Sequence, residues 1–302
     1  MKNEKLQFKI KNCATPKRSL GQNFLTSVGA VEKIVAASDD YTGLTILEVG
    51  PGRGVLTEAL LKKFKKVLAV EKDESLGGLL EEKFTTEIKT GRLKIVFGDI
   101  LKLNPTSLKL DDYAIVANIP YYITGQFLRN WLSTSPQPKY MVLMLQKEVA
   151  QRIIANSTGS GQTKESKESL LSISVKVYGE PHYIETIKSG SFFPAPKVDS
   201  AILKIDNISK NFFTKHHLET KFPSYLAKRE EAFFSLVKAG FAHKRKVLLS
   251  NLKAAKLLGN LVSKLEVSKL KEDLQSVFAT CHIDLKARAE DLTVENWRCL
   301  AD

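Results

Sequence analysis

The stretch that decides the fold reads Ile46-Leu47-Glu48-Val49-Gly50-Pro51-Gly52-Arg53-Gly54-Val55-Leu56-Thr57. An apolar strand pattern runs into a glycine turn and then into a helical pattern, which opens a βα unit of an α/β sheet. Glycines in such a turn adopt positive φ and let the backbone approach a ligand closely, so Gly50 and Gly52 are candidate ligand-binding residues. The spacing is G-x-G-x-G and not the G-x-G-x-x-G of dinucleotide-binding folds, so it argues against a ligand with a pyrophosphate group. Glu48 instead suits a cationic or amine-bearing ligand.

Strand-like apolar runs alternate with helical patterns through the first two thirds of the chain. The runs are residues 45–49, 66–70, 93–97, 113–117, 140–145, 172–178 and 200–205. This alternation predicts an α/β fold, with a mostly parallel, Rossmann-like sheet and helices on both faces. Sheets of this kind bind ligands outside the carboxyl ends of their strands, so the glycine turn lies where a ligand is expected.

Strand patterns stop near Lys210, and helical patterns follow. They cover residues 228–241, 244–252, 257–267 and 270–279, and Thr293 is the expected N-cap of a last short helix. We therefore expect a basic N-terminal arm at 1–16, an α/β domain at 17–209 and a small all-α domain at 210–302. The polar, Gly/Ser-rich stretch 156–169 is expected to be a surface loop.

The charge balance favours a polyanionic partner. The 302 residues are 43% hydrophobic, enough for a sizeable core, and 46 Lys+Arg against 33 Asp+Glu give a net charge of +13. Such an excess binds phosphate groups through counterion release. A generally basic set of cellular proteins, or solubility alone, would also account for it.

Cysteine and histidine patterns point away from a disulfide framework or a metal site. Cys13, Cys281 and Cys299 form no CxxC pair and leave an odd count, and the five histidines show no ligand spacing. A reducing compartment fits this pattern. No apolar run is long enough for a membrane span, and the start of the chain has no signal-peptide core. We therefore expect a cytoplasmic protein without a bound metal.

Two acidic residues follow the next strands along the chain. Glu71 closes an apolar run about twenty residues beyond the glycine turn, the spacing at which α/β folds place a carboxylate against ribose hydroxyls. Asp99 ends the following strand and can hydrogen-bond an adenine amino group. Because the carboxyl ends of parallel strands share one edge of the sheet, both acids are expected in the same crevice as the glycine turn.

The turn Asn118-Ile119-Pro120-Tyr121 follows another apolar strand and suits an unpaired amino-purine. An adenine N6 amine is a poor nucleophile, since its lone pair is delocalised into the ring, so attack on a methyl sulfonium needs acceptors for its hydrogens. The Asn118 side chain and the Ile119 carbonyl can supply them. Pro120 stiffens the turn, and Tyr121 can stack on the base, a contact worth about 1–3 kcal/mol. Positioning then supplies most of the catalysis.

A base buried in a stacked helix is out of reach, so the target must be unpaired or flipped out. A second aromatic wall would help to hold it. Phe192, in the rigid segment Phe192-Phe193-Pro194-Ala195-Pro196, is the best candidate. The alternative is that Phe192 and Phe193 are core residues in front of a strand.

The chain resembles the rRNA adenine N6-dimethyltransferase family, most of all its KsgA-type small-subunit branch. The resemblance covers about residues 17 to 301. It rests on Lys17-Arg18-Ser19-Leu20-Gly21-Gln22-Asn23-Phe24-Leu25, Leu47 to Thr57, Val70-Glu71-Lys72-Asp73, Gly98-Asp99-Ile100, Asn118 to Tyr121, Phe192 to Ser200 and Gly240-Phe241-Ala242-His243-Lys244-Arg245-Lys246-Val247-Leu248. It implies a class I methyltransferase fold, and it implies S-adenosylmethionine contacts from Gln22, Asn23, Leu25, Gly50, Glu71, Asp99 and Asn118.

The resemblance also implies the target and the partner. The expected reaction is dimethylation of two adjacent adenosines in the 3′-terminal hairpin loop of small-subunit rRNA, by a monomer acting on an immature 30S-type subunit during biogenesis. The expected rRNA surface is the basic helical region from Lys228 to Lys253, although a solvated helix face is the ordinary reading of a charge run.

Three alternative functions stay open. An Erm-type enzyme would methylate large-subunit rRNA, and Ile119, where the small-subunit branch often has Leu, also occurs there. A ribosome-assembly factor or transcription factor would make methylation incidental. A DNA adenine methyltransferase is less favoured, because those enzymes more often carry Asp/Asn-Pro-Pro-Tyr/Phe.

Overall fold

The computed structural model describes residues 15–39, 43–155, 167–214, 223–254 and 267–301. The chain forms two compact units, Met1–Ala150 with His182–Asp206, and Gln151–Pro181 with Asn207–Asp302. The second unit thus includes a segment, Gln151–Pro181, that the sequence analysis assigned to the α/β domain. Most of the expected arm at 1–16, of the loop at 156–169 and of the helix at 257–267 lies outside the described residues.

In the described residues, seven strands of the α/β fold form one sheet in the order β4-β3-β2-β5-β6-β9-β7. The strands are β2 (Thr45–Val49), β3 (Lys66–Glu71), β4 (Leu93–Phe97), β5 (Tyr113–Asn118), β6 (Met141–Gln146), β7 (Glu180–Ile187) and β9 (Ser200–Asp206). Neighbours from β4 to β6 are parallel, and β9 pairs antiparallel with β6. Chain order reverses between β2 and β5, which is where doubly wound sheets bind ligands. The predicted fold class is confirmed.

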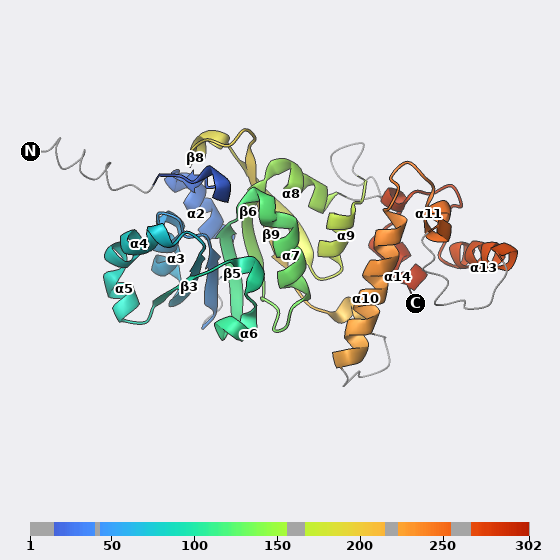
Figure 1. The fold of residues 1–302 in the computed structure, drawn as a ribbon, viewed down its shortest axis with the longest axis horizontal. Coiled ribbons are helices and arrows are strands. Elements are labelled where there is room, and N and C mark those ends of the chain that lie inside the picture. Colours follow the sequence, from blue (N-terminus) through green and yellow to red (C-terminus); the bar gives the residue numbers. More distant parts are fainter. Residues whose placement is uncertain (1–14, 40–42, 156–166, 215–222, 255–266, 302) are drawn as a thin grey trace, which may run out of the picture. The chain divides into compact units, whose positions relative to one another are not determined.

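Helices cover both faces of the sheet, because both faces of its strands are apolar (Figure 1). The helices of this part of the chain are α2 (Val28–Ala37), α3 (Val55–Lys63), α4 (Gly77–Lys83), α5 (Thr85–Lys89), α6 (Pro105–Leu108), α7 (Thr124–Ser133) and α8 (Lys147–Ile154). On one face, α2, α3 and α4 bury Ile34, Leu60 and Leu80 in a shared core. On the other, Trp131 of α7 makes an edge contact with Tyr113 of β5, with ring centroids 6.2 Å apart.

A second, two-stranded sheet joins distant parts of the sequence. The strands β1 (Phe24–Leu25) and β8 (Phe192–Phe193) pair antiparallel, with Phe24 opposite Phe193 and Leu25 opposite Phe192. The backbone N–H groups of Thr26 and Ser27 add hydrogen bonds to the Ser191 carbonyl at 2.9 and 3.3 Å. This pairing fixes the segment after residue 190 against the segment before α2.

The second unit is helical in its described part. It contains α9 (Leu170–Lys176), α10 (Pro223–Gly240), α11 (Leu248–Ala254), α13 (Val267–Thr280) and α14 (Val294–Ala301). Its core includes an aromatic cluster of Tyr178, Phe212, Phe213, Phe233 and Phe234. The expected N-cap is confirmed, since Thr293 Oγ1 accepts a hydrogen bond from the Asn296 N–H at 3.2 Å.

The predicted strand at 172–178 is wrong, because residues 172–176 belong to helix α9 and residues 177–178 form the turn after it. Ser169 and Ser172 form a reciprocal capping box, in which the Ser172 N–H donates to Ser169 Oγ at 3.1 Å and the Ser169 N–H donates to Ser172 Oγ at 2.7 Å. The helix then buries Ile173 and Val175. The next strand of the sheet along the chain is β7, Glu180–Ile187, which follows helix α9.

The prediction of no disulfide is also wrong, because Cys281 and Cys299 are bonded, with their Cα atoms 5.7 Å apart. The bridge joins the end of α13 to α14, and the Asn296 side chain donates to the Cys281 carbonyl at 3.1 Å beside it. Within the described ranges, no helix is long and apolar enough to span a membrane, and no cluster of acidic, histidine and cysteine side chains is arranged to hold a metal ion.

Candidate active site

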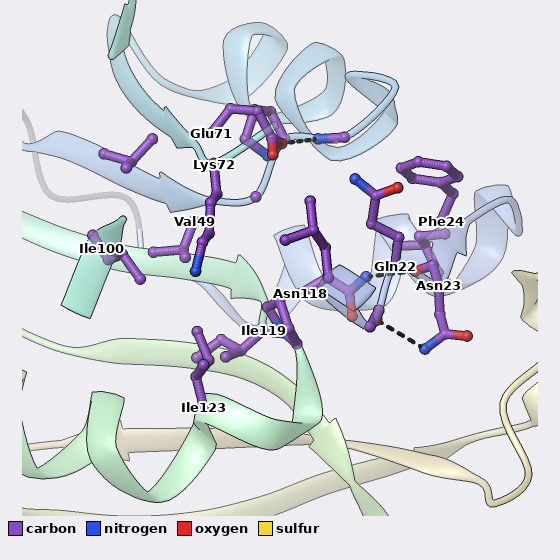
Figure 2. Close-up of a pocket in the computed structure, with 18 of the residues that line it drawn as sticks. Gln22, Asn23, Phe24, Val49, Glu71, Lys72, Ile100, Asn118, Ile119 and Ile123 are labelled. Carbon is purple, nitrogen blue, oxygen red and sulfur yellow. Dashed lines mark hydrogen bonds between the residues drawn. The ribbon is translucent and has the colours of Figure 1, made fainter. Parts of the chain in front are cut away.

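A pocket opens at the carboxyl ends of β2, β3 and β5, where the strand order reverses (Figure 2). Its walls come from the segment before α2, the glycine loop, the ends of three strands and the turn after β5. The predicted site residues that line it are Gln22, Asn23, Leu25, Gly50, Gly52, Glu71, Asp99, Asn118, Ile119, Pro120 and Tyr121. Residues predicted from separate segments therefore meet in one cavity, as the strand-end argument expected.

The glycine loop needs its glycines for two physical reasons. Gly50, Gly52 and Gly54 have φ of 70°, 57° and 73°, a region that side chains rarely adopt. At Gly52 a Cβ atom would also lie 2.9 Å from the Phe24 ring. The loop therefore brings bare backbone to the pocket wall, with Phe24 packed directly against it.

Glu71 ties the end of β3 to the glycine loop. Its carboxylate accepts hydrogen bonds from the Gly52 N–H at 3.1 Å and from the Asp73 N–H at 2.8 Å. Burial raises the pKa of Glu71, and the backbone donors offset that rise only in part. A carboxylate with two oxygens has further lone pairs, so Glu71 can still accept from ligand hydroxyls while it holds the loop.

Glu48 does not face the ligand, contrary to the interpretation made from its position before the turn. The side chain is 1% exposed and is not part of the pocket wall, and Thr57 is the neighbour whose hydrogen bonding partly offsets the effect of its burial. Burial raises the pKa of Glu48 to about 8. At neutral pH the group is therefore mostly a neutral carboxylic acid under the loop.

Asp99 lies in the pocket with a cationic partner that the sequence analysis did not assign. Asp99 accepts from Lys72 Nζ at 2.8 Å and from the Leu101 N–H at 3.0 Å. The hydrogen bond from Lys72 is the main reason that the pKa of Asp99 is lowered. Lys72 also lines the pocket (Figure 2). Its place between the acids Glu71 and Asp73 was the available signal.

Gln22 and Asn23 are held in place by the segments on either side of them. Gln22 donates to Asp73 at 2.9 Å, next to Lys17, which donates to the same carboxylate at 2.6 Å. Burial raises the pKa of Asp73, but the donors Lys17, Ser75 and Gln22 outweigh it and bring the pKa to about 2. An ionised Asp73 thus anchors the segment from Lys17 to Gln22, which leads into one wall of the pocket.

The turn after β5 presents its polar groups in a fixed orientation. The Asn118 side-chain nitrogen donates to the Asn23 carbonyl at 3.3 Å (Figure 2), which leaves the side-chain oxygen as the end that can accept from a ligand. The Ile119 N–H donates to the Met144 carbonyl at 3.2 Å. The Tyr121 hydroxyl lies 2.6 Å from Ser200 Oγ. The turn is therefore bonded to the residue before β1, to β6 and to β9.

Phe192 is not found in the pocket wall, which contradicts its predicted position. It is 4% exposed and belongs to the core between the sheet and α2 to α4. Its neighbour Phe193 is 55% exposed. Because successive residues of a strand point to opposite sides, burial of Phe192 turns Phe193 outward.

Known proteins resemble this chain over nearly its whole length. The family model for ribosomal RNA adenine dimethylase matches residues 14–297. The ribosomal RNA small subunit methyltransferase A of Dehalococcoides mccartyi (strain CBDB1) is 38% identical over 286 residues, which are 94% of this chain and 87% of that protein. The protein of the same name from Geobacillus sp. (strain WCH70) is 35% identical, over 95% of this chain and 90% of that protein.

Solved structures show the same architecture. A dimethyladenosine transferase from Plasmodium falciparum has a TM-score of 0.70 at 27% identity, over 92% of this chain and 95% of that one. The 23S rRNA methyltransferase ErmE has a TM-score of 0.66 at 22% identity, over 92% and 98%, and shows likeness in fold alone. The match to the family model over nearly the whole chain decides the assignment: this chain belongs to the ribosomal RNA adenine dimethylase family.

Proposed function

We propose that this protein uses S-adenosylmethionine to dimethylate the N6 amines of two adjacent adenosines in the 3′-terminal hairpin loop of small-subunit rRNA. The observation that carries the proposal is the orientation of Asn118, whose nitrogen is engaged by the Asn23 carbonyl so that its oxygen is left for an amine. The curated relatives named small subunit methyltransferase A favour this target over large-subunit rRNA.

The pocket fits the methyl donor on its own structural features. The loop at Gly50 and Gly52 offers backbone without side chains, and Glu71 and Asp99 offer carboxylates at adjacent strand ends. Gln22, Asn23 and Leu25 close the opposite wall. When bound, S-adenosylmethionine supplies an electrophilic methyl group on a positively charged sulfur.

The acceptor turn supplies positioning and hydrogen-bond acceptors. The Asn118 side-chain oxygen and the Ile119 carbonyl accept hydrogen bonds from the two N–H groups of the amine. These bonds favour a pyramidal nitrogen, whose lone pair is no longer delocalised into the ring. Tyr121, fixed through its hydroxyl to Ser200, offers a ring for the base to stack on. Holding the amine in line with the electrophile supplies most of the rate acceleration, so a base of shifted pKa is not required.

The RNA surface that we propose is the basic turn between α10 and α11, residues His243, Lys244, Arg245 and Lys246, all exposed. Four cationic or titratable side chains in one exposed turn suit phosphate contacts. Arg229, by contrast, donates to the Phe213 carbonyl at 3.1 Å and has a structural role. In this proposal the protein is a cytoplasmic monomer that acts on an immature 30S-type subunit.

Asn118→Ala tests the proposal, because it removes the side-chain acceptor. The turn keeps its backbone hydrogen bond from the Ile119 N–H to the Met144 carbonyl. We expect methylation to fall by at least about 100-fold, the cost of losing precise alignment of reacting atoms. Asn130→Ala is the matched control, since Asn130 lies on α7 and donates to the Leu101 carbonyl at 3.4 Å, outside the pocket. Mass spectrometry of the small-subunit 3′ fragment from a deletion strain carrying each variant measures the product.

The same strains separate the alternatives. Full modification by Asn118→Ala would refute the role of Asn118. Primer extension on both rRNAs that showed a lost stop in large-subunit rRNA alone would favour the Erm-type function. An Asn118→Ala protein that fully restored subunit assembly would make assembly, and not methylation, the main function.

A further inference from the structure

An exposed aromatic ring lies beside the pocket, stacked on a cation. The Arg53 guanidinium carbon is 4.7 Å from the centre of the Phe24 ring and 5.9 Å from the centre of the Phe193 ring, both within cation–π range. Arg53 and Phe24 line the pocket, whereas Phe193 does not. The three side chains therefore form a short series that leads from the pocket wall to the surface, with Phe193 at its outer end.

The outer ring is rigidly mounted. Phe193 pairs with Phe24 across the β1–β8 sheet, and the Ser191 carbonyl accepts three hydrogen bonds from Thr26 and Ser27. Phe192 anchors the same strand in the core. A ring held this firmly loses little further entropy when a ligand stacks on it, which favours binding.

The segments on either side of Phe193 are also fixed, and they carry two exposed lysines. Asp199 accepts from the Ser189 N–H at 3.1 Å and from Lys188 Nζ at 3.0 Å, and this closes the loop at its base. The Lys188 side chain is nevertheless 79% exposed, and Lys197 is exposed as well. An exposed ring with exposed lysines five residues before it and four residues after it is a combination that suits single-stranded nucleic acids, with bases on the ring and phosphates on the cations.

We propose that Phe193 stacks the nucleobase next to the adenosine that occupies the Asn118–Tyr121 turn. This inference rests on the proposed function, because it assigns a second nucleotide of the same RNA. Asn118 is bonded to Asn23, and Asn23 precedes Phe24, which pairs with Phe193. The Phe193 ring is therefore connected to the acceptor turn through β1 and lies outside the pocket. In this proposal the nucleotide next to the target adenosine lies against that ring. Every base has a flat face, so this contact selects for an unpaired base and not for its identity.

Phe193→Ala is the test, with Phe193→Trp as the matched control that keeps an aromatic face. The ligand is the 3′-terminal hairpin of small-subunit rRNA, used intact or with an abasic nucleotide directly 5′ or 3′ of the target adenosine. We expect Phe193→Ala to weaken RNA binding about 5- to 150-fold, the range for loss of one base–aromatic stack, and Phe193→Trp to keep the wild-type affinity. Fluorescence anisotropy measures binding, and calorimetric titration with S-adenosylhomocysteine reports whether the donor site is intact.

The abasic hairpins complete a thermodynamic cycle. The wild type is expected to lose the same factor on one of the two abasic hairpins, and Phe193→Ala is expected to lose nothing further on that hairpin. Losses that multiply at both positions, or a Phe193→Ala affinity within 2-fold of the wild type, would overturn the inference. Small-subunit rRNA whose two adenosines stay unmethylated in a deletion strain that carries the wild type would instead refute the proposed target, so the two failures are distinct.

Discussion

Glu48→Gln is expected to stabilise the protein at neutral pH by removing a buried group that must take up a proton on folding. The side chain is 1% exposed, and burial raises its pKa from 4.5 to about 8. In the unfolded chain the group ionises near 4.5, whereas in the folded chain it stays protonated up to about 8. Stability contributed by the wild-type residue is therefore full below pH 4.5 and is lost as the pH rises toward 8.

The size of the effect follows from that interval. Each pKa unit corresponds to about 1.4 kcal/mol, so the wild type loses roughly 3 kcal/mol between pH 4.5 and pH 7 relative to a residue that does not titrate. Glutamine has nearly the same shape and keeps polar atoms in the site, so it pays the same burial cost at both pH values. The difference in unfolding free energy between Glu48→Gln and wild type should therefore grow by about 3 kcal/mol over this range.

Urea unfolding followed by Trp131 fluorescence measures that difference, with Trp297→Phe introduced in every protein so that the second unit is silent. Trp131 lies on α7 in the same unit as Glu48, and Trp297 lies on α14. Glu58→Gln is the matched control, because Glu58 is half exposed and its pKa is lowered, mainly by a hydrogen bond from Lys62. A Glu48→Gln difference that is the same at pH 4.5 and pH 7 would show that Glu48 is not held neutral, and the reasoning would fail.

The remaining predictions concern the donor site, the RNA surface and the disulfide. Glu71→Ala should weaken S-adenosylmethionine binding by at least about 10-fold, since a charged acceptor is lost, while RNA affinity stays within 2-fold; unchanged heats in calorimetric titration would contradict this. Charge reversal at Lys244 and Arg245 should reduce the slope of log affinity against log salt by about two, and an unaltered slope in anisotropy titrations would place the RNA surface elsewhere. Replacing Cys281 and Cys299 by Ser should cost about 3 kcal/mol in urea unfolding, since the bridge closes a loop of 18 residues, and an unshifted midpoint would count against it.

Most of the α/β fold follows from patterns local in the sequence. Residues 45–49 and 93–97 were predicted as strands and are β2 and β4 with the same bounds. β2 is buried on both faces, whereas the edge strand β4 leaves Lys94 and Phe97 exposed. Both strands are mainly apolar and are followed directly by a glycine, Gly50 or Gly98, which marks where each one ends. Most of the site residues could be predicted from the strands alone, because the carboxyl ends of parallel strands lie at the same edge of the sheet.

Features that depend on distant partners could not be predicted in this way. The segment from Leu170 to Lys176 has the apolar residues of a strand, and only the capping box between Ser169 and Ser172 favours a helix. Cys281 and Cys299 meet because α14 packs beside the end of α13, and nothing in their spacing specifies that packing. Glu48 likewise reads as a ligand-facing carboxylate until the direction of its side chain is known.

The pair Phe192–Phe193 shows why side-chain direction is the part that the sequence leaves open. In a two-residue strand one ring points inward and the other outward, and either choice fits the same letters. The register with β1 fixes the choice: Phe192 lies opposite Leu25 and belongs to the core, whereas Phe193 lies opposite Phe24 on the side of the Arg53 guanidinium. A slip of that register by one residue would bury Phe193 and expose Phe192. The outward direction of the Phe193 ring is thus specified by β1, which lies about 170 residues earlier in the sequence. The proposed contact to the neighbouring base depends on the same pairing.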